Sequence, residues 1–381
     1  MPEVAKETPP PVEPKPAWLI IGMPTIPRRG ETGGVELKKT LLFRTIKSIA
    51  DQIKGTAWEP HPVAGGGVRV LVMNNRPGDH PYFSAARDYF GHMYHFIDFR
   101  ENNSPHEDKD LPRAAEFIND GKEEPTPKVR RQTLDVVALL DAVVGNSTYF
   151  YFTEDDFEFC ENTLMAIQYM IERANRYQGL HSWTGIRCGF GLNGIIMHNS
   201  DPVQDLRRFR DYLLRHFNRR PPDHLVVEFY AKESKEARKY FGADRHVMAF
   251  RYNVAKHIGG TQSTLREESA WSFPGCFTEL IAPQVFPVEA WNPVDCPHDD
   301  IWPCNYRNGA VHRSTIVWNS DKEAHVSNNR IIYVNKKEEE QHAADHEADG
   351  AAGHADDVPV VHHDEFAKKK HGHKHKHHAP V

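Results

Sequence analysis

The order of apolar runs and amphipathic segments between residues 17 and 177 constrains the fold more than any other feature. Short apolar runs of the kind that form buried strands lie at 17–26, 68–75, 94–99 and 149–152. Segments with the helical spacing of apolar residues lie at 37–53, 128–144 and 161–177. This alternation predicts an α/β fold in which helices flank a mainly parallel, Rossmann-like sheet.

Both ends of the chain differ from this pattern in composition. Residues 1–16 are rich in proline and charge, which predicts a disordered lead-in. Residues 336–381 are rich in Ala, Glu, His and Lys, which predicts a disordered tail. The histidines of this tail fit either a plain solvated segment or one that binds metal or changes charge near pH ~6.5. The sequence therefore predicts one folded domain at 17–335.

Charge and hydropathy exclude some functional classes. The formal net charge of −6 argues against general nucleic-acid binding. No run approaches ~18 consecutive apolar residues, so no membrane span is predicted. The first residues lack the apolar core of a signal peptide, so the protein is expected in the cytoplasm if this N-terminus is the native one.

The cysteines leave two interpretations open. There are five, so at least one thiol is free if the others pair. Cys296 and Cys304 are spaced to close a short disulfide loop, but two reduced thiols fit the sequence as well. No CxxC pair accompanies them, which argues against a zinc site.

Three consecutive carboxylates, Glu154, Asp155 and Asp156, follow the predicted strand at 149–152. Ligands of open α/β sheets bind beyond the carboxyl ends of the strands. Carboxylates at this edge are costly to bury unless solvent or a cation compensates them. Oxygen ligands suit Mg²⁺ or Mn²⁺, either of which can hold a diphosphate. The triplet therefore indicates a metal site for a nucleotide diphosphate, with an exposed acidic turn as the alternative.

Four segments, taken in order, resemble the GT-A glycosyltransferases of the N-acetylglucosaminyltransferase IV type. The segments are WLIIGMPTIPRR (18–29), KVRRQTLDVVALL (128–140), YFYFTEDDF (149–157) and KHIGGTQSTL (256–265). A related set, the transferases that add N-acetylgalactosamine to glycosylphosphatidylinositol anchors, shares the first strand and the acidic triplet, and residues 273–291 fit that set about as well. Either resemblance implies a GT-A-like fold and a UDP-sugar donor.

The resemblance also implies roles for residues that bind the donor. Pro24, Thr25 and Arg28 are expected to line the uridine side of the UDP-sugar. Arg130 and Arg131 are expected to face its phosphates, since arginine binds phosphate through two parallel N–H groups. A helix start with two solvated arginines is the alternative for this pair.

The metal, Mn²⁺ or Mg²⁺, is expected to be held by the acidic triplet and one histidine. The resemblance implies direct contact from Asp156, with Asp155 and Glu154 in support. Many GT-A enzymes add a late histidine to the metal, and His257 fits that place. A purely structural role for His257 is the alternative.

The implied reaction moves a sugar, GlcNAc by resemblance, from the UDP-sugar to a hydroxyl of a glycan or glycolipid acceptor. If the reaction inverts the anomeric centre, a carboxylate must accept the proton of that hydroxyl. Asp223 is the first candidate for this base and Glu228 the second. Asp223 could instead cap a helix after the two prolines.

The glycine-rich segment at 183–198 is not a dinucleotide-binding fingerprint, because the spacing of Gly189, Gly191 and Gly194 does not precede a helix. It is predicted to form a strand, a turn and a second strand. The turn fits either a place where an acceptor approaches the backbone or a plain hairpin.

Two other functions remain open beside the transferase. One is a non-catalytic GT-A-like protein that binds a nucleotide sugar. The other is a metal-dependent nucleotidyltransferase or phosphohydrolase, against which the absence of a Gly-rich phosphate loop argues. By resemblance, the protein is expected in the Golgi or ER lumen, although the sequence shows no anchor.

Overall fold

The computed structural model describes residues 15–28, 35–103, 125–242, 245–259, 273–281, 287–297 and 299–304, and the backbone of 322–327 and 330–335. The predicted disordered segments therefore lie outside the described residues, apart from positions 15 and 16. The chain divides into one compact unit, Met1–Tyr333, and a second, Val334–Val381. The fold below is that of the first unit.

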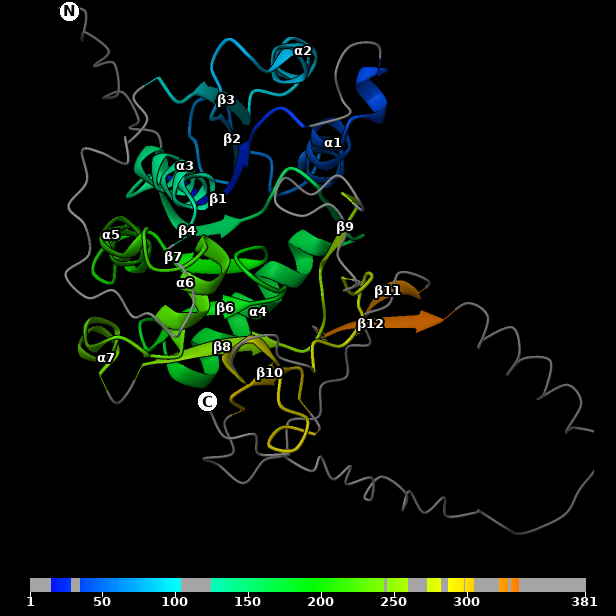
Figure 1. Cartoon of the computed structure of the whole chain (residues 1–381). Coiled ribbons are helices and arrows are strands. Elements are labelled where there is room, and N and C mark those ends of the chain that lie inside the picture. The colour runs from blue at the N-terminus through cyan, green and yellow to red at the C-terminus, as the bar shows by residue number, and fades with distance from the viewer. Residues whose placement is uncertain are drawn as a thin grey trace, which may run out of the picture. The chain divides into compact units, whose positions relative to one another are not determined.

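An eight-stranded sheet is formed by the described residues, in the order β10-β8-β6-β7-β4-β1-β2-β3 (Figure 1). Its strands are β1 (Ala17–Thr25), β2 (Val68–Asn74), β3 (Ile97–Glu101), β4 (Ser147–Phe152), β6 (Trp183–Arg187), β7 (Ile195–His198), β8 (His246–Phe250) and β10 (Ile301–Trp302). β3, β2, β1 and β4 form a parallel block, and β6 is parallel to β8. β7 and β10 run antiparallel to their neighbours. The predicted α/β class is confirmed, with a sheet that is mixed beyond β4.

Helices cover both faces of the sheet (Figure 1). They are α1 (Leu41–Ile53), α2 (Pro81–Gly91), α3 (Pro127–Val143), α4 (Thr163–Gln178), α5 (Asp205–His216), α6 (Pro222–Tyr230) and α7 (Lys235–Phe241). Leu19 and Ile21 of β1 share a core with α1, α2 and α4. Ile20 shares a separate core with α3, α5, α6 and α7. Successive side chains of a strand point to opposite faces, so an apolar run such as that of β1 is required where both faces are covered.

The predicted elements are confirmed at most positions, with three differences. The strand predicted at 94–99 forms later, as β3 at Ile97–Glu101. Helix α2 was missed, although Phe83, Ala86 and Phe90 are buried at helical spacing. The helix predicted from residue 37 divides into a 3₁₀ turn, η1 (Leu37–Lys39), and α1. The division lies at Thr40, whose hydroxyl accepts a hydrogen bond from the backbone N–H of Phe43 and so caps α1.

A second, small sheet pairs β5 (Phe157–Phe159) with β9 (Ala255–His257) in antiparallel fashion. Phe157 lies opposite His257 in this pairing. Because β5 begins directly after the acidic triplet, the pairing carries His257 to the carboxyl end of β4. β11 (Lys322–Ser327) and β12 (Arg330–Asn335) form a two-stranded sheet of their own.

The cysteines form two disulfides. Cys296 pairs with Cys304, so the disulfide interpretation of this spacing is the correct one. Cys160 pairs with Cys276 across 116 positions of sequence, a bond that no local spacing indicated. It joins the end of β5 to residues 273–281. Cys188 is a buried free thiol.

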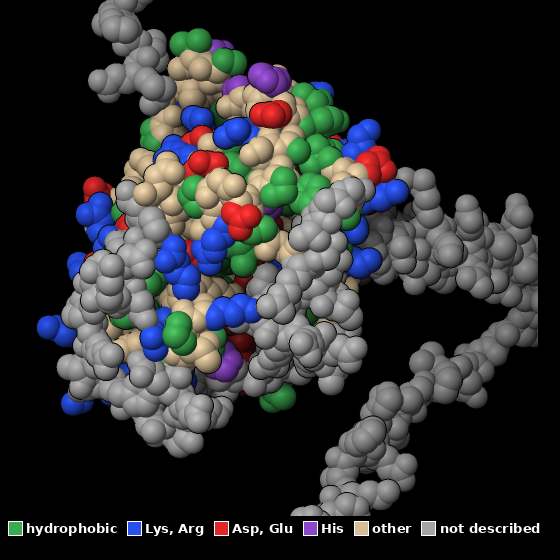
Figure 2. Space-filling view, turned by 45° about the horizontal axis from the view of Figure 1, so that its top comes forward, with side chains coloured by type: hydrophobic (Ala, Val, Ile, Leu, Met, Phe, Trp, Pro, Cys, Tyr) green, Lys and Arg blue, Asp and Glu red, His purple; other side chains and the backbone are tan. Residues whose placement is uncertain are grey.

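Basic, acidic and apolar side chains are interspersed on the visible face of the described residues (Figure 2). No helix among these residues is long and apolar enough to cross a membrane.

His198 is expected to make folding stability depend on pH. Burial between Trp183 and Tyr149 lowers the pKa of His198 to about 3. The unfolded chain binds a proton below pH ~6.5 and the folded chain does not, so the free energy of unfolding falls as pH decreases from ~6.5 towards 3. This loss reaches roughly 5 kcal/mol at most. Chemical denaturation between pH 4 and 7 should show a shallower slope for His198→Gln, and an identical slope would contradict the assignment.

Candidate active site

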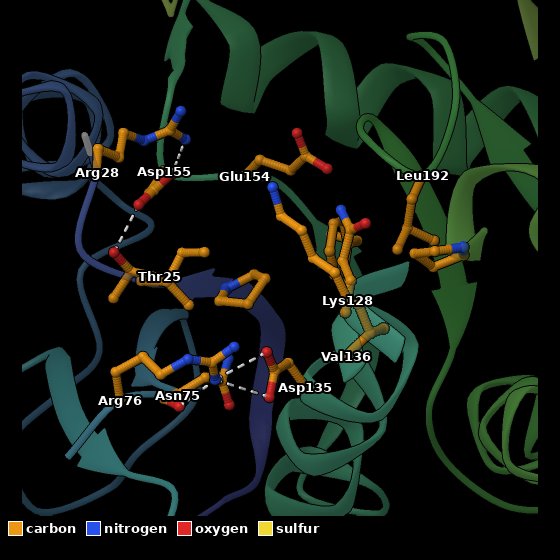
Figure 3. Close-up of a pocket in the computed structure, with 15 residues that line it drawn as sticks. Thr25, Arg28, Asn75, Arg76, Lys128, Asp135, Val136, Glu154, Asp155 and Leu192 are labelled. Carbon is orange, nitrogen blue, oxygen red and sulfur yellow. Dashed lines mark hydrogen bonds and ion pairs between the residues drawn. The ribbon is translucent and has the colours of Figure 1, made fainter. Parts of the chain in front are cut away.

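A pocket lies at the carboxyl ends of β1, β2 and β4, where the sheet edge meets α3. Its cavity of about 120 Å³ is far larger than the ~10–15 Å³ that one water requires. It is lined by Pro24, Thr25, Ile26, Arg28, Asn75, Arg76, Lys128, Gln132, Asp135, Val136, Phe152, Glu154, Asp155, Leu192 and Pro222. Ligands of open α/β sheets bind at this edge, so the pocket is the candidate active site (Figure 3).

Arg28 neutralises the acidic triplet at this edge. Its guanidinium donates to Asp155, and its Nη1 lies 3.1 Å from Asp156 Oδ2. All three side chains are nearly inaccessible to water. Burial opposes the charge on Arg28, but the carboxylates of Asp155 and Asp156 outweigh it and raise the pKa of Arg28. The cost of burying adjacent carboxylates is thus offset within the protein, and the alternative of an exposed acidic turn is wrong for Asp155 and Asp156.

Asp155 is fixed by further contacts from neighbouring elements. The Thr25 hydroxyl donates to Asp155 Oδ2 at 2.5 Å, and Thr45 donates to the Asp155 backbone carbonyl at 3.0 Å. His80 Nε2 lies 2.9 Å from the Thr25 hydroxyl. Asp155 therefore has its carboxylate oxygens committed to Thr25 and Arg28.

Asp156 and His257 face each other beside the small sheet. His257 Nε2 lies 3.1 Å from Asp156 Oδ2, and the backbone N–H of Ile258 donates to the Asp156 carbonyl at 2.8 Å. The second carboxylate oxygen, Oδ1, is buried without a hydrogen-bond partner among the described residues. Burial acts to raise the pKa of Asp156, but hydrogen bonding from His257 and the charge of Arg28 outweigh it and lower the pKa. Asp156 is therefore expected to be ionised, with one oxygen, Oδ1, that accepts no bond from a described residue.

These two residues fit a small divalent cation. They present one carboxylate oxygen without a partner and one imidazole nitrogen, which are ligand types that Mn²⁺ accepts. Gly259 keeps space beside them, since a Cβ on it would lie 2.3 Å from Asp156 Oδ2 and 2.9 Å from His257 Nε2. No group of three or more His, Cys, Asp or Glu residues within the described ranges is arranged to hold a metal alone. Further ligands would have to come from a bound diphosphate and water.

Glu154 and Asp223 form a second pair of interacting carboxyl groups. Glu154 lines the pocket and is half-buried. Burial, then the negative charges of Asp223 and Asp156, raise the pKa of Glu154 well above its usual range. Burial also raises the pKa of Asp223, and a hydrogen bond from Leu192 opposes this. Carboxyl groups in such a pair share protons at pH values where an isolated one is fully ionised.

The glycine-rich turn between β6 and β7 orients Asp223. The backbone N–H of Leu192 donates to Asp223 Oδ1 at 3.1 Å. Gly191 adopts a φ of +61°, and a Cβ there would lie 3.2 Å from the Asp223 carboxyl. Buried Arg187 donates to the Gly191 carbonyl at 2.8 Å and so holds the turn. The predicted strand–turn–strand at 183–198 is confirmed, and its turn reaches the candidate base.

The two candidates for the base have different environments. Asp223 lies in the first turn of α6, but the N-cap is Pro221 and no side chain caps the helix. The helix-cap interpretation of Asp223 is therefore wrong. Glu228 is fully buried, with Tyr212 donating to it and Arg219 Nε 3.3 Å away. The proposal of Glu228 as a base is wrong, because its carboxylate is enclosed in a structural ion pair and cannot reach an acceptor.

The pocket brings together some of the predicted donor-binding residues and not others. Pro24, Thr25 and Arg28 line it. Arg130 and Arg131 do not: Arg130 donates to the Pro125 carbonyl at 3.0 Å, and Arg131 Nε donates to Asp135 at 3.2 Å.

Five polar pocket residues escaped the sequence analysis, and one of them, Asp135, lies on α3 and pairs with Arg76. Lys128 and Gln132 line the pocket from α3, one helical turn apart, and Asn75 and Arg76 line it directly after β2. The helical spacing of 128 and 132 and the polar turn after the predicted strand at 68–75 were signals that could have identified them.

Gly259→Ala is expected to disrupt the Asp156–His257 site with little effect on folding. The added Cβ displaces one of the two side chains, because contacts below 3.0 Å cannot be kept. Metal affinity should fall by at least ~10-fold, as for other changes that misplace a metal ligand. Titration with Mn²⁺ measures this.

Gly91→Ala is the matched control for this change. Gly91 ends α2, and a Cβ on it would meet nothing within 4 Å. Equal metal affinities for the two variants would show that the space beside Gly259 has no role in binding.

Comparisons with known proteins leave the family open. No protein-family model and no curated protein matches the chain. Among solved structures, it matches a crystal structure of S. aureus TarS 1-349 at 11% identity and a TM-score of 0.35, over 65% of this chain and 67% of that one. A second TarS structure matches at 10% identity and a TM-score of 0.31, over 58% of this chain and 41% of that one. Likeness at this level shows nothing about the reaction.

Proposed function

We propose that the protein is a metal-dependent glycosyltransferase that moves a sugar, GlcNAc, from a UDP-sugar to a hydroxyl of a glycan or glycolipid. The observation that carries this proposal is that a pair of side chains suited to a metal and a candidate base lie near the same edge of the sheet. Asp156 and His257 form a pair suited to a cation, and Asp223 is a half-buried carboxylate held by a backbone N–H. A pocket lined by Arg28 and Lys128 lies beside them.

The side chains divide the work of the transfer among them. Arg28 and Lys128 contribute positive charge where a diphosphate leaving group develops negative charge. Asp223 accepts the proton of the acceptor hydroxyl, and its raised pKa brings its basicity closer to that of an effective general base. The hydrogen bond from Leu192 occupies one oxygen and leaves the other for the acceptor.

Asp156 and His257 would hold the metal, Mn²⁺ or Mg²⁺, which when bound supplies Lewis-acid stabilisation of the departing diphosphate. Asp155 supports them by fixing Arg28 beside Asp156. Glu154 lines the pocket beside them, and burial with the charges of Asp223 and Asp156 raises its pKa, which favours its uncharged form.

The disulfides favour an oxidising compartment for this reaction. Stable disulfides are typical of secreted and lumenal proteins and rare in the cytosol. The Cys160–Cys276 bond holds residues 273–281 against the small sheet, where the ring of Phe273 lies 4.4 Å from that of His257. We therefore propose the Golgi or ER lumen, and place the reaction among those that build glycans there.

A turnover assay over a panel of UDP-sugars tests the proposal. With Mn²⁺ and glycan acceptors, release of UDP and a matching mass increase of the acceptor are expected for one donor, and EDTA should abolish both. Release of pyrophosphate or inorganic phosphate would instead identify a nucleotidyltransferase or phosphohydrolase. Product only with UDP-GalNAc and a glycosylphosphatidylinositol acceptor would identify the related transferase set.

One observation favours a second candidate, a non-catalytic protein that binds a nucleotide sugar. The guanidinium of Arg28 already bridges Asp155 and Asp156. A positive side chain therefore occupies the position at which a metal-dependent enzyme binds its metal ion. Metal-independent UDP binding without turnover of any donor is the result expected from this candidate.

A further inference from the structure

Two side-chain amide atoms of the pocket lack a hydrogen-bond partner among the described residues. They are Nδ2 of Asn75, which follows β2, and Oε1 of Gln132, on α3. Both atoms are buried and make no hydrogen bond with any described residue. A buried polar group without a partner costs ~1–3 kcal/mol, and native proteins leave few of them. Two in one pocket indicate a ligand that supplies the missing bonds.

Asn75 is held so that one end of its amide stays unpaired. Its backbone N–H donates to the Thr25 carbonyl at 3.0 Å, and its Oδ1 accepts from Asn102 Nδ2 at 3.1 Å. Asn102 bonds to the oxygen of this amide, so its N–H groups are the donors that stay unpaired at the pocket wall.

The two ends of the pocket differ in charge (Figure 3). Arg28, Glu154 and Asp155 lie at one end, which suits a diphosphate and its metal. Asn75, Arg76 and Asp135 lie at the other. There Arg76 Nη1 contacts both carboxylate oxygens of Asp135, at 3.3 and 3.1 Å, and Arg131 Nε donates to the same carboxylate at 3.2 Å. These charged groups bind one another, so the amides of Asn75 and Gln132 are the neutral hydrogen-bonding groups that the pocket offers to an uncharged heterocycle.

We propose that Asn75 and Gln132 determine base recognition by binding the edge of uracil, where N3–H lies beside a carbonyl. Gln132 Oε1 accepts from N3–H, and Asn75 Nδ2 donates to the adjacent carbonyl oxygen. The inference rests on the proposed nucleotide site and extends it from the diphosphate to the base. A site built to bond an N–H group rejects analogues without one, because its own buried groups are then left unpaired.

Binding measurements test this independently of sugar transfer. In calorimetry with Mn²⁺, Gln132→Leu and Asn75→Asp are each expected to weaken UDP binding by about tenfold or more, the size of one lost hydrogen bond to a buried partner. Inorganic diphosphate should bind all three proteins within about twofold of one another. Lys128→Met is the matched control on α3 and is expected to weaken UDP and diphosphate alike.

A ligand analogue gives the converse test. UDP methylated at N3 should bind the wild type weakly and lose nothing further with Gln132→Leu, since the same bond is absent in both. Gln132→Leu removes an unpaired buried acceptor, so it should not lower the melting temperature, and misfolding cannot explain its effect. Unchanged UDP affinity in both variants, or no UDP binding by the wild type, would overturn the inference. UDP binding that depends on Asn75 and Gln132 without turnover of any donor would uphold it while the transferase proposal fails.

Discussion

Asp223→Asn is expected to lower kcat by roughly 10²–10⁴-fold, the usual contribution of a general base. Asparagine keeps an oxygen that can accept the hydrogen bond from Leu192, so the turn and the fold should survive. KM for the donor and the affinity for UDP should stay within about twofold, because Asp223 does not line the donor pocket. Because burial raises the pKa of Asp223, the acid limb of the wild-type pH–rate profile should lie above the pH of ~4 expected for an ordinary Asp.

The control for this variant is Asp211→Asn on α5, whose carboxylate pairs with Arg210 at 2.9 Å outside the pocket. Its kcat should match that of the wild type. If Asp223→Asn loses less than about threefold in kcat, Asp223 is not the base.

Asp156→Asn is expected to lower kcat/KM by about 10²–10³-fold or more, as for removal of one group that stabilises the leaving-group charge. The neutral amide cannot balance a cation, and it leaves His257 without its ionised partner. Arg28 keeps its ion pair with Asp155, so folding should be preserved. Turnover at increasing Mn²⁺ concentration measures the effect, and higher Mn²⁺ should restore part of the activity.

Glu158→Gln is the matched control, because this carboxylate lies on β5 and pairs with Arg44 at 3.0 Å away from the pocket. A loss of activity equal to that of Asp156→Asn would point to general instability of the small sheet. Full activity of Asp156→Asn would exclude it as a metal ligand.

Local patterns were sufficient for much of the fold. The apolar run of β1 and the helical spacing of α3 required only neighbouring residues to interpret, and both elements form where predicted. The position of Glu154–Asp156 after β4 was also a local signal, and it located the pocket edge correctly. The resemblance suggested Asp223 as the base. It could not reveal that the backbone N–H of Leu192, in the turn before β7, orients this carboxylate.

Long-range contacts were the part that sequence could not supply. Arg28 was expected at the uridine, but its bridge between Asp155 and Asp156 depends on the close approach of β1 and β4. The burial of Glu228 depends on how α5 packs on α6, which its own segment does not reveal. On α3, Arg130 and Arg131 were predicted to bind phosphate because of their charge. The helix instead presents Lys128 to the pocket.

The most direct test of the central claim is a calorimetric titration of UDP into the wild-type protein, with Mn²⁺ and then with EDTA. If Asp156 and His257 hold a cation that binds the diphosphate, UDP should bind at least about tenfold more tightly with Mn²⁺, and this gain should vanish in Asp156→Asn. Equal affinity with Mn²⁺ and with EDTA would show that Arg28 serves in place of a metal and would contradict the metal-dependent transferase.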